Sequence, residues 1–123
     1  MTFIKYRKEL SFALPPLVSI ANNGRINFHK LTVENYKINS FKYGILSYDP
    51  TYKKIGIEFT NNEQEVGTYK IHHDENSSYI INGRFLDYFG IRPKHKTTHY
   101  IRYDGKANML IVFLRRLYRP VKG

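Results

Sequence analysis

Three clusters of basic residues are the parts of this sequence best suited to binding chemistry. They lie at residues 5–8, 92–96 and 115–122, and a tyrosine interrupts the first and the last. Arginine and lysine neutralise phosphates and release counterions, and tyrosine stacks on unpaired bases. The clusters favour a polyanionic partner, and we expect the C-terminal cluster to contribute most; each cluster alone also fits a solvated face or a chain end. The candidate phosphate ligands are Lys5, Arg7, Lys8, Arg92, Lys94, Lys96, Arg115, Arg116 and Arg119.

The sequence offers little for catalysis or metal binding. His72 and His73 precede two carboxylates, but neighbouring residues on a strand point to opposite faces and cannot readily chelate one ion. A nuclease needs carboxylates that converge on a divalent ion, and the acidic residues show no such spacing. No phosphate loop, nucleophile elbow or dinucleotide-binding turn is present. We predict no catalytic residue, metal or cofactor; an enzyme that uses Asp74, Glu75 or the histidines ranks third among the functions considered.

The positive charge is concentrated near the C-terminus. The chain has 20 basic and 10 acidic residues, and residues 92–123 alone carry nine basic residues against one acidic residue. Repulsion among so many positive charges destabilises a compact domain unless a polyanion screens the charges. Nucleic acid is the commonest such partner, with an anionic membrane, an acidic protein or plain solubility as alternatives. Residues 61–91 are net acidic and would fit either a solvated surface or the basic stretch of a second copy.

Composition excludes several classes of protein. The chain has 123 residues, 41% of them hydrophobic, which suits one globular domain spanning residues 1–123. The absence of cysteine excludes disulfides, thiol catalysis and thiolate zinc sites. The longest apolar run, residues 109–114, is far shorter than the roughly 18 residues of a membrane helix. Residues 1–9 lack the apolar stretch of a signal peptide, so we expect a cytoplasmic protein.

Alternation of apolar and polar residues predicts mostly strands in the first half of the chain. A hairpin is expected at residues 17–28, with Asn23-Gly24 in a type I′ turn. A short helix capped by Thr32 is expected at 31–36. A second hairpin is expected at 43–59, with Pro50 in a type I turn. The residues predicted to be buried in the two hairpins are Val18, Ile20, Ile26, Phe28, Ile55, Ile57 and Phe59.

The second half follows a polar loop at residues 60–66 and uses similar elements. Strands are expected at 68–72 and 78–81, then a helix capped by Asn82 and ended by Gly90. Strands at 98–103 and 109–114 flank a turn at Asp104-Gly105, and the second is apolar on both faces, which predicts a central position. The predicted fold is mainly β (α+β), a small β-barrel or sheet of hairpins with one or two short helices and a basic tail at 115–123.

Two sequence matches suggest an internal duplication with half-units 17–59 and 68–114. Asn23-Gly24-Arg25 matches Asn82-Gly83-Arg84. Tyr48-Asp49, followed six residues later by Ile55-Gly56-Ile57, matches Tyr103-Asp104, followed six residues later by Leu110-Ile111-Val112. Because such turns also recur by chance, a chain without duplication remains the alternative.

The first half resembles the AbrB/MazE/MraZ group of swapped-hairpin transcription factors. In that group a Gly-Arg-aliphatic step, here Gly24-Arg25-Ile26, leads into a short helix and a β-hairpin, and two units interleave into a DNA-binding barrel. The resemblance implies DNA contacts by Arg25 and, in a second unit, by Arg84. The proline that usually opens the helix is replaced by His29-Lys30, and the second unit has no strand between Arg84 and its helix. Small single-strand-binding sheets such as PC4-like or OB-type proteins have a similar composition.

The sequence therefore favours a non-enzymatic nucleic-acid-binding protein, with DNA preferred to RNA, that resembles a transcription regulator. We expect a homo-oligomer, associated with the nucleoid if it binds DNA, and no membrane or small-molecule substrate. The alternative is a structural or assembly protein of a virus or large complex, whose basic surface docks on an acidic partner.

Overall fold

The computed structural model describes residues 15–75 and 77–119, and these residues fold mainly as β-strands. Lys5, Arg7 and Lys8 lie outside the described residues. The strands are β1 (Leu17–Ile20), β2 (Arg25–Phe28), β3 (Tyr43–Asp49), β4 (Lys54–Thr60), β5 (Thr68–Lys70), β6 (His72–His73), β7 (Ser78–Ile81), β8 (Thr97–Asp104) and β9 (Met109–Leu117). The helices are α2 (Lys30–Tyr36), α3 (Gly83–Tyr88) and the 3-10 turn η1 (Ile38–Ser40).

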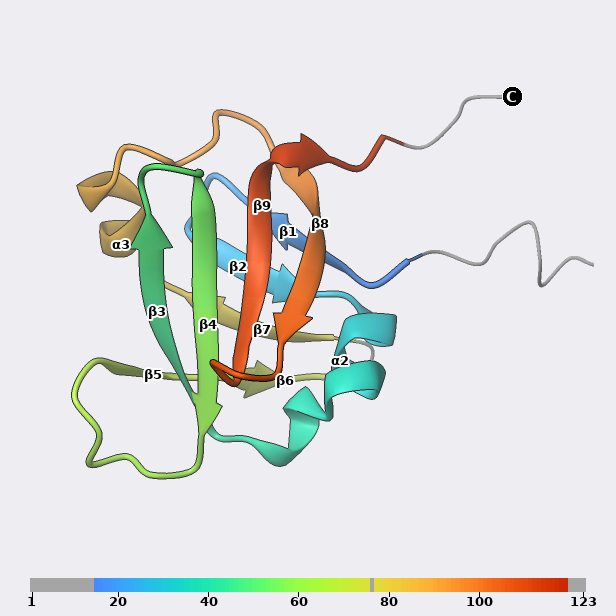
Figure 1. Cartoon of the computed structure of the whole chain (residues 1–123), viewed down its shortest axis with the longest axis vertical. Helices are drawn as coiled ribbons and strands as arrows, with labels where there is room; N and C mark the ends of the chain where they lie inside the picture. The colour runs from blue at the N-terminus through green and yellow to red at the C-terminus, as the bar shows by residue number, and fades with distance from the viewer. Residues whose placement is uncertain (1–14, 76, 120–123) are drawn as a thin grey trace, which may run out of the picture.

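Over the described ranges, one antiparallel sheet runs in the order β5-β3-β4-β9-β8-β1-β2-β7-β6. The strand predicted at 68–72 is in fact two strands, because β5 pairs with β3 and β6 pairs with β7. Only Ile71, which is buried, separates β5 from β6. The two ends of the strand order therefore meet, and the sheet is nearly closed into a barrel (Figure 1).

The first predicted hairpin is confirmed, but its turn differs from the prediction. All four residues expected on the buried face of β1 and β2 are almost fully buried. A type I′ turn needs positive φ at both central residues, whereas only Gly24, at 91°, has positive φ in this turn. Gly24 N–H donates to Ala21 O and Ala21 N–H donates to Arg25 O. These bonds define a longer loop in which glycine alone takes the left-handed conformation.

The two helices begin differently. His29, not Thr32, precedes α2; Thr32 is buried inside the helix and its hydroxyl donates to Leu17 O at 2.7 Å, so the predicted Thr32 cap is wrong. In α3 the prediction is confirmed, because Asn82 Oδ1 accepts from Phe85 N–H at 3.0 Å. Gly90 ends this helix with φ 65°.

The β3–β4 and β8–β9 hairpins have matching turns. Asp49 Oδ1 accepts from the N–H groups of Thr51 and Tyr52, and Asp104 Oδ1 accepts from those of Lys106 and Ala107. Four residues after each aspartate, Lys53 and Asn108 have positive φ values of 57° and 50°. The β8–β9 hairpin thus repeats the local structure of the β3–β4 hairpin.

The two halves also repeat one pattern of strand pairing. β5 and β6 together take the place that β1 has in the first half. With this correspondence the β1·β2 pairing matches β6·β7, β3·β4 matches β8·β9, and β1·β8 matches β5·β3. The two remaining ladders, β2·β7 and β4·β9, each pair a strand with its own counterpart. This arrangement has an approximate two-fold axis, which passes near the pairs Ile26–Ile80 and Gly56–Ile111.

The two sequence matches have different outcomes in the structure. The hairpin match places Ile55-Gly56-Ile57 directly against Leu110-Ile111-Val112 across β4 and β9. The match between the Asn-Gly-Arg tripeptides is wrong, because residues 23–25 form a hairpin turn whereas residues 82–84 begin a helix. The two tripeptides instead touch, with Asn82 N–H donating to Gly24 O at 2.9 Å.

The core fills the barrel, and each helix packs on the opposite half. The buried cluster joins residues of both halves, such as Phe28, Ile57, Ile80 and Leu110. Tyr36 of α2 stacks on Tyr103 in the β8–β9 hairpin at 5.3 Å between ring centroids. Phe89, just after α3, contacts Tyr48 of β3 at 4.8 Å. As predicted, β9 is central in the strand order, between β4 and β8.

Candidate nucleic-acid interface

The outer side of β4, β9 and β8 carries a group of positive side chains, which we call the basic face. Register places Lys54 opposite Phe113 and Arg102 opposite Ile111, all on positions that alternate with the buried residues of their strands. Arg115 and Arg116 follow on β9, which continues to Leu117. The predicted tail at 115–123 therefore begins on a strand, and the positions of Arg115 and Arg116 are set by the sheet. The basic face consists of Lys54, Arg102, Phe113, Arg115 and Arg116.

Phe113 is the aromatic centre of the basic face. The Lys54 ammonium lies 5.3 Å and the Arg116 guanidinium 4.8 Å from the centroid of its ring. Both distances are within the range of cation–π attraction, about 6 Å. The ring thus holds two cations close together, although like charges repel.

A shallow depression of about 750 Å³ lies over this face. Its lining includes all the residues of the basic face together with Tyr100, and no lining residue within the described chain is acidic. Tyr100 is 40% exposed and meets Tyr118 edge to face at 5.9 Å. Cations and exposed aromatic rings therefore share one surface, the combination that binds phosphates and stacks bases.

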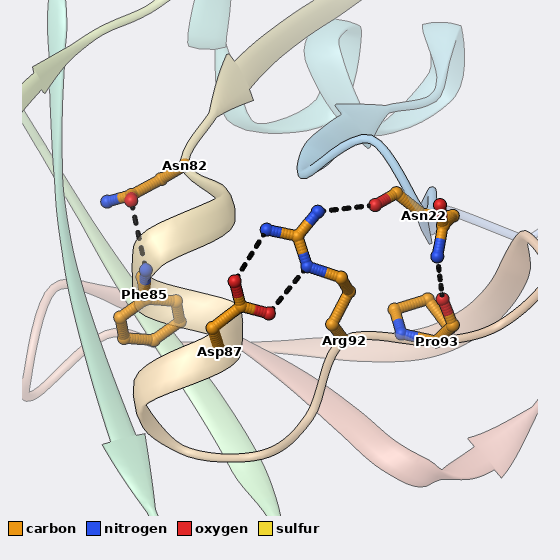
Figure 2. A network of polar contacts seen from close by, with 6 residues as sticks. All are labelled: Asn22, Asn82, Phe85, Asp87, Arg92 and Pro93. Carbon is orange, nitrogen blue, oxygen red and sulfur yellow. Dashed lines mark hydrogen bonds and ion pairs between the residues drawn. The ribbon is translucent and has the colours of Figure 1, made fainter.

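Arg92 has a structural role and is left out of the proposed interface. Its Nε and Nη2 donate to the two carboxylate oxygens of Asp87, at 2.6 and 2.9 Å, and its Nη1 donates to Asn22 O at 2.7 Å (Figure 2). Asn22 in turn donates to Pro93 O. The hydrogen bond from Arg92 lowers the pKa of the Asp87 carboxyl. Arg92 thus joins the β1–β2 turn to α3.

The other predicted ligands are scattered. Arg25 lies on β2, on the other side of the barrel from the basic face, and Lys96 lines a groove beside it. Arg84 is exposed on α3, so Arg25 and Arg84 do not hold equivalent positions as the tripeptide match implied. Lys94 is exposed in the loop before β8, and Arg119 is exposed just after β9. Of the predicted residues, the basic face brings together Arg115 and Arg116.

Sequence reasoning missed Lys54, Arg102 and Phe113. Lys54 and Arg102 are separated from the basic clusters along the chain, and only the pairing of β4, β9 and β8 brings them beside Phe113, which precedes the C-terminal cluster by two residues. A signal was present in the alternation, because Lys54 immediately precedes the buried Ile55 and Arg102 immediately follows Ile101, which packs against the core.

The histidine-rich segment forms internal contacts. His73 bonds with Ser78 Oγ at 2.6 Å and donates to Phe41 O at 2.9 Å, and the His72 ring stacks on Tyr79. Across residues 15–75 and 77–119, no three His, Asp or Glu side chains are arranged to hold a metal ion. The helices of this same part of the chain are all too short or too polar to cross a membrane.

Comparison with known proteins gives no relative for this chain: no family model, no curated protein and no solved structure matches it.

Proposed function

We propose that this protein binds nucleic acid, with DNA preferred to RNA, and catalyses no reaction on it. The observation that carries the proposal is the basic face, where Lys54, Arg102, Arg115 and Arg116 surround Phe113. Because strands position all five of these side chains in one sheet and Arg116 stacks on Phe113, the cations are held in place before binding. Pre-ordering of this kind lowers the entropy cost of association.

The proposed mechanism is electrostatic. Lysine and arginine on the basic face neutralise backbone phosphates and release counterions, so affinity falls steeply as salt rises. Phosphate contacts fix the position of the bound nucleic acid and carry little information about its base sequence. We therefore expect modest sequence preference, with Tyr100 and Phe113 available for stacking when bases are unpaired.

The interleaved halves support a role like that of a transcription regulator. In the AbrB/MazE/MraZ group, which the first half resembles, two hairpin units interleave into a barrel that binds DNA. Here β4 pairs with β9 and β2 pairs with β7, so two units interleave within one chain. This likeness is our reason for preferring DNA and a nucleoid location in the cytoplasm. The expected homo-oligomer stays a prediction.

Fluorescence anisotropy with labelled duplex DNA, single-stranded DNA and RNA at several salt concentrations tests the proposal. We expect the tightest binding to DNA and a log–log salt slope of about −3 to −4, in line with about four phosphate contacts. Replacing Arg115, Arg116 and Arg119 with glutamate should weaken binding by at least about a hundredfold, since two contacts of the basic face become repulsive and Arg119, just after β9, adds a third reversed charge.

A control with the same net charge separates a local site from the total charge. Lys37, Lys42 and Lys70 are all exposed and lie outside the basic face, so their replacement with glutamate changes the charge equally. This control should weaken binding far less than the C-terminal triple variant. Equal losses in both variants would contradict the assignment to the basic face.

An exposed aromatic surface at α3 favours the second candidate, a structural or assembly protein. Tyr88 is 83% exposed and Phe89 is 38% exposed, and Ile81 beside the helix is 53% exposed. Exposed apolar side chains of this kind are common at protein interfaces. Failure to bind any of the three nucleic acids at low salt would favour this candidate, with the basic face docked on an acidic protein.

A further inference from the structure

A second positively charged surface lies on the opposite side of the barrel, over β1 and β2. This β1–β2 groove has a volume of about 520 Å³ and is lined by side chains from β1, β2, the start of α2 and the loop before β8. It is separate from the basic face, since none of its lining residues also lines that depression. Its size is within the range of about 300–1,000 Å³ that is typical of small-molecule sites.

Three cations converge on the β1–β2 groove. Arg25 comes from β2, Lys30 from α2 and Lys96 from the loop before β8. Among the described residues that line the groove, none is acidic. The nearest carboxylate that contacts a cation of the groove is Asp74, whose Oδ2 lies 3.7 Å from Arg25 Nη2. Three positive charges close together with so little compensation favour an anion with more than one charge.

Hydroxyl and imidazole groups form an internal hydrogen-bonded network at the floor of the groove. Ser19 is only 3% exposed, and its Oγ lies 2.6 Å from His29 Nε2 and 2.8 Å from Thr98 Oγ1. Burial, and then the nearby Lys96, lower the pKa of His29, so this imidazole is neutral at pH 7. Ser77 also lines the groove, and its hydroxyl donates to Asp74 Oδ1 at 3.1 Å. The floor is therefore polar and ordered, whereas the positive charge comes from the rim.

Arg25 is held in place by a stack of flat groups. Its guanidinium lies 3.6 Å from the centroid of the Tyr79 ring, and Tyr79 stacks on His72 with centroids 5.0 Å apart and planes 16° apart. A guanidinium held in this way keeps its edge donors in a fixed plane, which matches the bidentate geometry of phosphate oxygens.

We propose that the β1–β2 groove is a binding site for a phosphate monoester, with Arg25, Lys30 and Lys96 as the charged ligands. A monoester carries nearly two negative charges at pH 7, which suits three cations better than the single charge of a backbone phosphodiester does. The phosphate comes either from a free small molecule, such as a nucleotide, or from the 5′ end of a nucleic-acid strand.

NMR titration of the ¹⁵N-labelled protein tests this proposal with five probes. They are inorganic phosphate, adenosine 5′-monophosphate, adenosine, and a short oligonucleotide with either a 5′-phosphate or a 5′-hydroxyl end. We expect saturable shifts around Ser19, Arg25 and Ser77 with the phosphorylated probes and none with adenosine. Saturation by the monophosphate identifies a small-molecule ligand, whereas saturation only by the 5′-phosphorylated oligonucleotide identifies a strand end.

Variants show whether the shifts report the groove. Lys30 and Lys96 are exposed, so the double variant K30Q/K96Q should fold normally, and it should bind the phosphorylated probe at least about tenfold more weakly. The matched control K37Q/K42Q also removes two exposed cations, from outside both the groove and the basic face, and should change this affinity less than twofold. Lys96→Gln alone is the second variant if the double variant does not fold.

Two results would overturn the proposal. One is the absence of saturable binding by every phosphorylated probe at low salt. The other is a loss of affinity in K37Q/K42Q that equals the loss in K30Q/K96Q, because binding would then follow total charge. The experiment is independent of the proposed function, since duplex binding depends on the basic face and the monoester on the groove.

Discussion

In the β3–β4 hairpin, Ser47, Glu58 and Thr60 occupy the outward positions at which the β8–β9 hairpin has Arg102, Phe113 and Arg115. The inward positions are far more alike, because Ile55 and Leu110 are equivalent and both are fully buried. The turns are alike as well, with an aspartate that accepts two backbone N–H groups in each. The comparison separates residues that fix the backbone from residues that are free to give one hairpin a binding surface.

The interior gives the largest predicted effect. Ile55→Ala and Leu110→Ala each remove a fully buried side chain at equivalent positions on β4 and β9, where the two hairpins pair. We expect each variant to lose about 3 kcal/mol of unfolding free energy, through lost burial and a residual cavity. Urea unfolding followed by circular dichroism measures this. A loss confined to one variant would show that the hairpins do not share the core equally.

The two Asn-Gly-Arg tripeptides differ most sharply at their glycines. A Cβ at Gly24 would lie 2.7 Å from Gly83 N and 2.8 Å from Gly83 Cα, in a residue whose φ is 91°. A Cβ at Gly83 would meet the end of the flexible Arg92 side chain instead. We expect Gly24→Ala to destabilise the protein by more than about 2 kcal/mol, and Gly83→Ala by about 1 kcal/mol. Thermal unfolding of both variants checks that Gly24→Ala loses more stability than Gly83→Ala. The reverse order would show that a small backbone shift relieves the contact between the added Cβ and Gly83.

The matching turns predict matching losses. Asp49→Ala and Asp104→Ala each leave two backbone N–H groups without their side-chain acceptor, although water can reach these exposed turns. We expect each to lose about 1 kcal/mol of stability. Asp49→Asn and Asp104→Asn keep an acceptor oxygen and serve as controls with smaller losses. Unequal effects of the two alanine variants in chemical denaturation would mean that only one turn supports its hairpin.

The smallest expected effect concerns pH. His99 of β8 is buried at the position where β3 has Gly44, and burial lowers its pKa despite hydrogen bonds to backbone carbonyls that raise it. The unfolded chain therefore takes up this proton first, at about pH 6.5, and stability falls as pH decreases from there through the folded pKa. His29 contributes in the same direction.

Denaturation at several pH values measures this effect. We expect His99→Asn to make the decrease of stability below pH 6.5 less steep. A His29→Asn variant then measures how much of the remaining decrease comes from His29. An unchanged pH profile in His99→Asn would show that this imidazole becomes protonated within the fold.

Local signals predicted much of the fold. Asn82 and Gly90 marked the ends of α3, and alternation found the hairpins and the central strand. The sequence left a barrel and an open sheet as alternatives. The barrel forms because the chain changes its pairing partner at Ile71, with β5 on β3 and β6 on β7, and no local signal marks that change. Thr32 was misread as a cap because a buried hydroxyl bonded to Leu17 has the same sequence signal as an N-cap.

The candidate site was predicted only in part, for a similar reason. Arg115 and Arg116 stood out as a cluster in the sequence, but Lys54 and Phe113 are neighbours only through the β4·β9 ladder. Arg92 was misassigned because charge alone does not distinguish a phosphate ligand from the partner of Asp87.

The position of β9 has a consequence for synthesis of the protein on the ribosome. The last strand of the chain lies between β4 and β8, near the middle of the sheet. While the ribosome is still making the second half, β4 has an open edge and the side chains of Ile55 and Ile57 lack their neighbours Leu110 and Val112. The barrel is therefore complete only after β9 has left the exit tunnel, and until then the nascent chain exposes a strand edge of the kind that chaperones bind.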